Sequence, residues 1–157
     1  IIQVGDPEML YKQPRSLFTA SFLGESNFLE GRIREVTRDG FLVEVEGKKT
    51  VNVSDLDKWK RGDRVVLVVR AENVEITQGK SQRRNTIPGI VGRSQFIQGF
   101  MRYEIRAETG VDFVAWIHTS GGESFLTGSQ VIINLEPTNV LLFSYPEEGL
   151  ERAISFE

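Results

Sequence analysis

His118 is the only histidine in the chain, and there is no cysteine. A zinc site takes several histidine or cysteine ligands, so His118 alone cannot assemble one. A nucleophilic serine needs a base and an orienting acid beside it. Ser120, Ser124 and Ser129 follow His118 along the chain but show no such pattern. We therefore expect no catalytic residue, no metal site and no cofactor in this chain, and we expect that it is not an enzyme.

Two further patterns match ligand-binding motifs only in part. Gly79-Lys80-Ser81 resembles the end of a phosphate-binding loop, but that motif requires a glycine where Val74 stands and a helix afterwards. Asp55, Asp57 and Asp63 carry carboxylates of the kind that bind calcium, but their spacing is not that of a calcium loop. We interpret these segments as a charged linker and a solvated acidic loop.

A basic cluster is formed by Lys80, Arg83 and Arg84, and the second half of the chain is rich in aromatic residues. Some small β-barrels bind single-stranded nucleic acid through this combination. The formal net charge of -3, however, offers no general attraction to a phosphate backbone. A single-strand-binding module stays an alternative, but we expect no nucleic-acid partner.

The aromatic residues of the second half have two interpretations. They fill a small core, or they form exposed contacts between subunits, where aromatic residues and methionine are enriched. The sequence alone does not separate the two. We predict that six residues are interface contacts: Phe96, Phe100, Met101, Tyr103, Trp116 and Phe125.

The composition is that of a soluble globular protein, with 157 residues of which 39% are hydrophobic and 26% charged. The absence of cysteine allows a reducing compartment. No apolar run approaches the ~20 residues of a membrane-spanning helix, so we expect no direct membrane insertion. The chain begins Ile1-Ile2-Gln3-Val4, without methionine or a signal-peptide layout. We expect it to be part of a longer polypeptide.

An internal repeat organises the chain. The apolar run from Gly62 to Ile76 is repeated 66 positions later, from Gly128 to Leu142. A second pair, Asn27 to Ile33 and Asn85 to Val91, has an offset of 58. Two copies of one unit, the second eight residues longer in its middle, explain both offsets. Alternation predicts that one face of each run points inward: Val65, Leu67 and Val69 in the first copy, and Val131, Ile133 and Leu135 in the second.

Residues 1–26 differ from the β-rich remainder. Asp6-Pro7-Glu8 is typical of a helix start, and the pattern predicts two short helices over 6–13 and 16–23. Further on, Asp39-Gly40 predicts a hairpin turn. We also expect a continuous strand from Phe96 to Arg106 and a closing edge strand at Ile154 and Phe156.

The predicted fold is mainly β, with two small OB-like barrels formed by the duplicated unit and preceded by the two helices. We divide the chain into a helical segment (1–26), a first repeat (27–78), a linker (79–84) and a second repeat with a C-terminal strand (85–157).

The residues also resemble a known family. The segment from Ile1 to Pro14, with Leu17-Phe18 and Phe22-Leu23-Gly24, is similar to the end of the nucleotide-binding domain of ABC importer ATPases. The remainder resembles the transport-associated OB (TOBE) regulatory domain that follows it in maltose, polyamine, ferric-iron and molybdate importers. Val69-Arg70-Ala71-Glu72-Asn73-Val74 matches an R-P-E-[DN]-[VI] element of that domain, with Ala71 in place of the usual proline.

The resemblance implies a non-catalytic regulatory and dimerisation domain with MOP/TOBE-type barrels. The parent ATP-binding subunit would be a homodimer that uses ATP and Mg, and it would act with membrane permease subunits on the cytoplasmic face of the cell membrane. Glu25 to Gly31 and Asn85 to Gly89 look most like the polyamine branch, which imports spermidine and putrescine.

A second resemblance leaves an alternative open. Arg84 to Val91 is similar to the opening motif of Mop-like domains, which bind molybdate or tungstate through backbone amides and hydroxyls between subunits. Ser81 stands one residue further from the Arg84-Asn85 pair than in that motif. The alternative function is therefore that of an oxyanion sensor.

Overall fold

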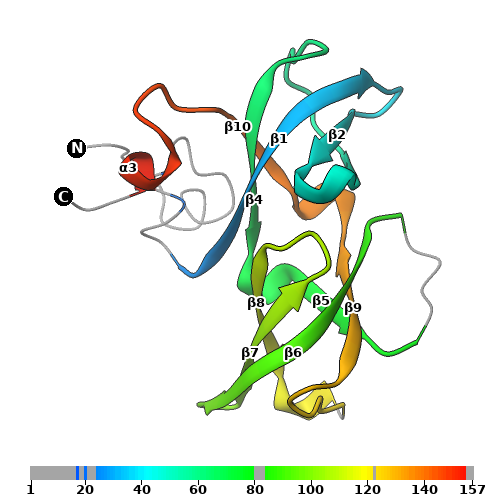
Figure 1. Ribbon diagram of the computed structural model, residues 1–157, viewed down its shortest axis with the longest axis vertical. Coiled ribbons are helices and arrows are strands. Elements are labelled where there is room, and N and C mark those ends of the chain that lie inside the picture. The colour runs from blue at the N-terminus through cyan, green and yellow to red at the C-terminus, as the bar shows by residue number, and fades with distance from the viewer. Residues whose placement is uncertain (1–16, 18–19, 21–23, 80–83, 122, 155–157) are drawn as a thin grey trace.

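The computed structural model describes residues 17, 20, 24–79, 84–121 and 123–154, and it contains two five-stranded antiparallel sheets (Figure 1). The first sheet has the order β10-β4-β1-β2-β3, and the second has the order β5-β9-β6-β7-β8. The first is built from β1 (Ser26–Val36), β2 (Phe41–Val45), β3 (Thr50–Val53), β4 (Arg64–Arg70) and β10 (Leu141–Ser144). The second is built from β5 (Val74–Thr77), β6 (Thr86–Ile97), β7 (Phe100–Ala107), β8 (Asp112–His118) and β9 (Gln130–Leu135).

Short helical turns connect the strands: η1 (Glu46–Lys48), η2 (Ala71–Asn73), η3 (Thr119–Gly121) and η4 (Pro137–Asn139). In the second sheet the edge strands β5 and β8 contact each other, which curls the sheet toward a partly open barrel. This is the mainly β, duplicated OB-like architecture that the sequence predicted. No helix in the described ranges is long and apolar enough to cross a membrane.

The two repeats agree in local geometry as well as in strand order. Gly62 and Gly128 both have positive φ, +93° and +88°, which glycine adopts at no steric cost. Gly62 N donates to Ile33 O at 2.7 Å, and Gly128 N donates to Val91 O at the same distance. Ile33 and Val91 themselves differ by 58 positions, so the hydrogen bonds reproduce both sequence offsets.

Each sheet takes its fifth strand from the other repeat (Figure 1). After β4 the turn η2 carries the chain to the second sheet, where β5 pairs with β9. After β9 the equivalent turn η4 carries it back, and β10 pairs with β4. The expected boundary near residue 79 therefore does not separate the two sheets. The division of the chain into 1–26, 27–78, 79–84 and 85–157 stays a prediction at the level of sequence repeats.

One hydrophobic core joins the two sheets. Val65, Leu67 and Val69 of β4 and their equivalents in β9 are all buried in it, as the alternation predicted. The opposite face of β4 presents Val66 and Val68 to a second, smaller core. A strand buried on both faces has a continuous apolar sequence, and this is the form of β4.

The second core covers the outer face of the first sheet. Leu17 and Ala20, the two described residues of the predicted helix 16–23, are helical and pack on Val66 and Val68. The buried Arg70 guanidinium donates from Nη1 to Ala20 O at 3.1 Å, which ties this segment to β4. The other predicted helix, 6–13, lies outside the described residues.

The end of the chain corrects one prediction. Ile154 lies in the short helix α3 (Leu150–Ile154) and not in an edge strand, while Phe156 lies outside the described residues. Leu150, Ala153 and Ile154 have the i, i+3, i+4 spacing of a helical face, and all three pack on the second core. The strand prediction rested on only two alternating apolar residues, Ile154 and Phe156, and the helical spacing of three apolar residues is the stronger pattern.

Candidate interaction surface

The hairpin between β6 and β7 is longer than its counterpart in the first repeat. Val36 pairs with Phe41 in the first repeat, and Ser94 pairs with Tyr103 at the equivalent place in the second. Four residues separate the first pair, and eight separate the second. We call these eight residues, Gln95–Arg102, the extended hairpin. It projects at one end of the molecule (Figure 1).

A tight turn at Gln98 and Gly99 reverses the chain, with φ values of 43° and 86°. The expected continuous strand from Phe96 to Arg106 is therefore wrong. Thr119, at the start of η3, donates from both its backbone N and its Oγ1 to Gly99 O at 2.9 Å. The turn is thus held by the loop that follows β8.

The extended hairpin is apolar and partly exposed. Phe96 is 66% exposed, and Phe100 and Met101 are half-buried. Phe100 lies 5.9 Å from the Trp116 ring and makes an edge contact with the His118 ring at 4.9 Å. No residue from Ser94 to Met101 is charged. Four of the six predicted contact residues lie on or beside this hairpin, with Phe96 and Met101 paired on one face and Phe100 and Trp116 in contact on the other. We call Phe96, Phe100, Met101 and Trp116 the hairpin patch.

Tyr103 and Phe125, the other two predicted contacts, belong to the core. Tyr103 is fully buried and Phe125 is 4% exposed. Their rings meet edge to face at 5.5 Å, and Phe125 N donates to the Tyr103 hydroxyl at 3.2 Å. Tyr103 is the equivalent of Phe41, which is also buried, because both residues begin the part of the hairpin that faces the core. They cannot serve as exposed contacts.

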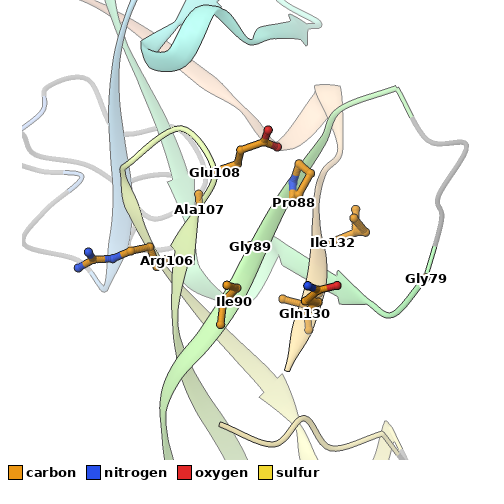
Figure 2. Close-up of a pocket in the computed structure, with 10 residues that line it drawn as sticks. Gly79, Pro88, Gly89, Ile90, Arg106, Ala107, Glu108, Gln130 and Ile132 are labelled. Atoms are coloured by element: carbon orange, nitrogen blue, oxygen red, sulfur yellow. The ribbon is translucent and has the colours of Figure 1, made fainter. Parts of the chain in front are cut away.

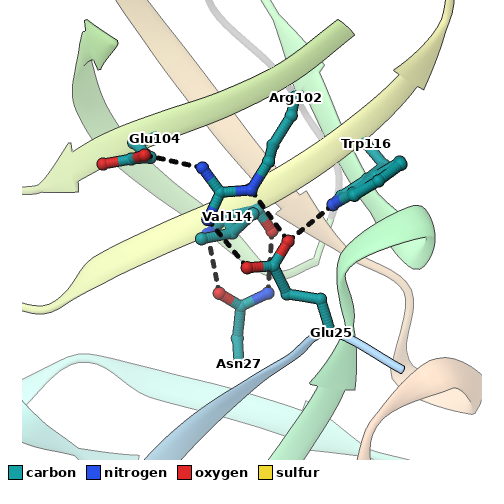
Figure 3. A network of polar contacts seen from close by, with 6 residues as sticks. All are labelled: Glu25, Asn27, Arg102, Glu104, Val114 and Trp116. Atoms are coloured by element: carbon teal, nitrogen blue, oxygen red, sulfur yellow. Dashed lines mark hydrogen bonds and ion pairs between the residues drawn. The ribbon is translucent and has the colours of Figure 1, made fainter. Parts of the chain in front are cut away.

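A network of hydrogen bonds and ion pairs lies at the base of the extended hairpin (Figure 3). The Arg102 guanidinium donates to both Glu25 carboxylate oxygens, at 2.9 and 2.7 Å, and to Glu104 at 2.6 Å. Trp116 Nε1 donates to the same Glu25 carboxylate at 2.7 Å. These bonds lower the pKa of Glu25, with Arg102 the largest cause. Glu25 and Glu104 in turn raise the pKa of Arg102.

Sequence reasoning did not find this network, because Glu25 and Arg102 are 77 residues apart. It links the segment before β1 to Arg102 of β7 and Trp116 of β8, and so it attaches the base of the extended hairpin to the body of the molecule. A bidentate arginine–carboxylate pair is the strongest form of surface ion pair.

His118 and Ser120 form a local contact at the edge of the hairpin patch. Ser120 Oγ lies 2.7 Å from His118 Nδ1, and both side chains are exposed. A serine–histidine catalytic pair also needs an acid that orients the ring. Within the described part of the chain, no carboxylate forms a hydrogen bond or ion pair with His118. The contact therefore closes the turn after β8 and lacks the elements of a triad.

The described acidic and basic residues that the sequence suggested as ligand-binding candidates form hydrogen bonds within the protein itself. Asp55 and Asp63 accept hydrogen bonds from the backbone N of Asp57 and Lys60 at 3.0 and 2.9 Å, which shapes the loop. Among the described residues, no group of three metal-binding side chains comes together. Arg84 donates to Asn52 Oδ1 at 3.2 Å. Lys80, Ser81 and Arg83 lie outside the described residues.

No protein-family model matches the chain. Individual proteins are similar to the chain in sequence. Three of them are spermidine/putrescine import ATP-binding proteins (PotA). The protein from Onion yellows phytoplasma is 33% identical over 140 residues, which is 89% of this chain and 30% of that protein. The protein from Acetivibrio thermocellus is 33% identical over 94% of this chain and 38% of its own length. That from Thermotoga maritima is 29% identical over 70% of this chain and 31% of its own.

Among solved structures, the chain is similar to the cytoplasmic molybdate-binding protein ModG, with a TM-score of 0.62 and 15% identity. The match covers 76% of this chain and 96% of ModG, and at this identity it shows the fold. The chain spans about a third of the length of the import proteins that it matches. It is thus a homologue of part of the ATP-binding subunits of ABC-type polyamine importers, with the duplicated β fold of a MOP/TOBE-type domain.

Proposed function

We propose that this chain is the non-catalytic regulatory and dimerisation domain of the ATP-binding subunit of an ABC importer, of the spermidine/putrescine type. In this proposal ATP and Mg bind in another part of the subunit, which lies on the cytoplasmic face of the membrane and contacts permease subunits. The domain holds two subunits together while their catalytic parts open and close.

The proposal that this domain holds two subunits together rests on the hairpin patch. The extended hairpin adds residues that the first repeat folds without, and these residues place Phe96 two-thirds exposed in an uncharged run. Aromatic residues at the centre of a small patch are typical of subunit contacts. The Glu25–Arg102 pair anchors Trp116 and the base of the extended hairpin, and side chains restrained before binding lose less entropy when they bind.

Sedimentation velocity over a concentration series tests this proposal. We expect a dimer at high concentration and a shift toward monomer in the double variant Phe96→Ser/Phe100→Ser. The matched control is Val36→Ser, which removes another exposed apolar side chain from the equivalent hairpin of the first repeat. A strict monomer at every concentration contradicts the dimerisation half, and equal effects of the two variants contradict the surface.

The fold likeness to ModG, whose structure has molybdate bound, favours an oxyanion sensor as a second candidate. The site would lie near Arg84 and Asn85. Calorimetry with molybdate, tungstate and sulfate tests it, and the absence of heat with all three contradicts it. In the described residues the Asn85 side chain is already bonded to backbone groups of Asn52 and Leu135, so we place this candidate second.

A further inference from the structure

A groove of about 680 Å³ follows the free edge of β10 in the first sheet. Four consecutive residues, 140–143, form one of its walls. Side chains of consecutive strand residues point to opposite faces of a sheet, so a groove that touches all of them runs along the edge of the strand. The other wall is formed by the loop 54–57, which follows the edge strand β3, together with Asp39.

The backbone of β10 offers unpaired groups at this edge. Tyr145 N donates to Arg64 O at 3.2 Å, in register with the ladder between β10 and β4. Antiparallel residue pairs alternate between hydrogen-bonded and non-hydrogen-bonded, so the odd-numbered residues of β10 bond to β4. The N–H and C=O groups of Leu142 and Ser144 therefore point away from β4, and no hydrogen bond joins them to another residue that the structure describes. Unpaired groups at a sheet edge are a template for an added strand.

The second repeat has a strand of the protein itself at the equivalent place. There the edge strand β8 packs on β5, which is equivalent to β10 by the offset of 66. In the first sheet the groove lies between β10 and the loop that follows β3, the strand equivalent to β8. The edge that β8 covers in one repeat is thus bordered by an open groove in the other.

The charge of the groove favours a positively charged occupant. Three aspartates line it, and the described lining residues include no lysine or arginine: Asp39, Asp55 and Asp57. Arg84 lies 3.8 Å from Asp39, but both side chains are more than half exposed, so this pair neutralises little of the charge. Leu56, also in the lining, is 99% exposed. Opposite charges on neighbouring strands stabilise their pairing, so these aspartates favour lysine or arginine in an added strand.

A hollow of about 570 Å³ on the second sheet lacks this backbone feature (Figure 2). Its apolar residues Pro88, Ile90 and Ile132 lie in β6 and β9, and both of these strands have a neighbouring strand on either side. Their backbone groups are therefore used within the sheet. This hollow offers no edge to an added strand, and it serves as an internal control.

We propose that the groove beside β10 binds an extended segment of another protein that carries lysine or arginine at alternate positions. The segment adds to the first sheet as a further strand, its backbone bonds to Leu142 and Ser144, and its positive side chains lie near Asp55 and Asp57. Strand addition of this kind takes affinity from main-chain hydrogen bonds and specificity from alternate side chains. The groove shares no residue with the hairpin patch, so this site does not depend on dimerisation or on an importer role.

NMR titration of the 157-residue chain with the capped peptide KVKVK tests the proposal. We expect saturable amide shifts centred on residues 141–143. Hydrogen exchange of the Leu142 amide should slow at least tenfold at saturation, because the peptide supplies an acceptor for it. Spermidine carries three positive charges, as the peptide does, but it has no backbone amides. It should bind at least tenfold more weakly and should leave exchange at Leu142 unchanged.

Variants locate the site. Asp55→Asn/Asp57→Asn removes two charges and keeps the oxygen that accepts from the backbone N of residue 57, so it should only weaken KVKVK binding, by at least tenfold. Glu123→Gln is the matched control, because Glu123 is exposed and takes the position of Asp57 in the second repeat by the offset of 66. It should bind like wild type. The absence of saturable binding, spermidine binding as tight as that of the peptide, shifts centred on Ile90 and Ile132, unchanged exchange at Leu142, or wild-type affinity in the double variant would each overturn the proposal.

Discussion

Asn27 and Asn85 are equivalent residues of the two repeats, and each one ties its own sheet to the opposite sheet. Asn27 Nδ2 donates to Val114 O of β8 at 2.9 Å, and Val114 N donates back to Asn27 Oδ1 at 2.7 Å (Figure 3). Asn85 makes the same reciprocal pair with Asn52 of β3, at 2.8 and 2.7 Å. Each asparagine also donates to its own sheet, at Val69 O or Leu135 O. Both side chains are buried, so they act as a symmetric clamp.

Replacement of either asparagine by alanine should therefore destabilise the whole molecule. Asn27→Ala and Asn85→Ala each leave buried backbone groups without partners, and each should lower the free energy of unfolding by ~2–3 kcal/mol. Urea unfolding measures this, with the exposed Gln78→Ala as the control that should change little. If only one of the two variants is destabilised, the clamp is not symmetric.

Glycine is required at a second pair of equivalent positions. A Cβ on Gly31 would lie 2.8 Å from Val43 Cγ1, and one on Gly89 would lie 2.7 Å from Ile105 Cγ2. Gly31→Ala and Gly89→Ala should each cost ~1–3 kcal/mol in unfolding free energy because the neighbouring strand must shift. Gly92→Ala in β6 is the control, since its Cβ meets nothing closer than 3.6 Å. A loss in Gly92→Ala as large as in Gly89→Ala would contradict this steric explanation.

The strand content and the inward faces could be predicted because they depend on local alternation. Val65 and Val131 lie in runs whose pattern was visible twice, and internal repetition strengthens a weak periodic signal. The exchange of β5 and β10 between sheets could not be predicted in this way. Both copies leave their own sheet at the same point, after β4 and after β9, so the two sequences look alike whether the fifth strand stays or crosses.

Four of the six predicted contact residues lie on or beside the extended hairpin, and their role as an interface stays a prediction; the missed turn and the buried Tyr103 have specific causes. Gln98-Gly99 is not one of the asparagine–glycine or aspartate–glycine pairs that signal a tight turn, so the reversal was missed. Tyr103 was placed at the surface because aromatic type alone does not separate core from interface. Alignment of the two repeats through the longer hairpin would have matched it with the apolar Phe41.

Acid should weaken the support of the extended hairpin. Arg102 lowers the pKa of Glu25 below its ordinary value of 4.5, so the folded chain holds this carboxylate ionised more readily than the unfolded chain does. The stability from this pair is complete above the unfolded pKa and is lost as the pH falls through the lower, folded pKa.

Glu25→Gln should therefore lower the free energy of unfolding at pH 7 by on the order of 1 kcal/mol. Below about pH 4 the difference in stability between this variant and wild type should become smaller. Thermal unfolding between pH 3 and pH 7 measures this. Glu44→Gln is the control, because the Glu44–Arg34 pair is 3.8 Å apart and about half exposed. A pH-independent gap between Glu25→Gln and wild type would mean that the loss comes from packing alone.

The assignment of Phe125 to the core and Phe96 to the surface makes the last prediction. Phe125→Ala removes a ring that is 4% exposed and packs on Tyr103, so it should cost ~3–5 kcal/mol of unfolding free energy. Phe96→Ala removes a ring that is mostly in solvent and should change the value by less than ~0.5 kcal/mol in the monomer. Urea unfolding at low protein concentration keeps self-association out of the comparison. At high concentration Phe96→Ala should lose stability relative to wild type, because a contact between subunits adds to the stability of the folded state by mass action. Equal costs for the two variants at low concentration would show that Phe96 is part of the core, and the hairpin patch would then lose its central residue.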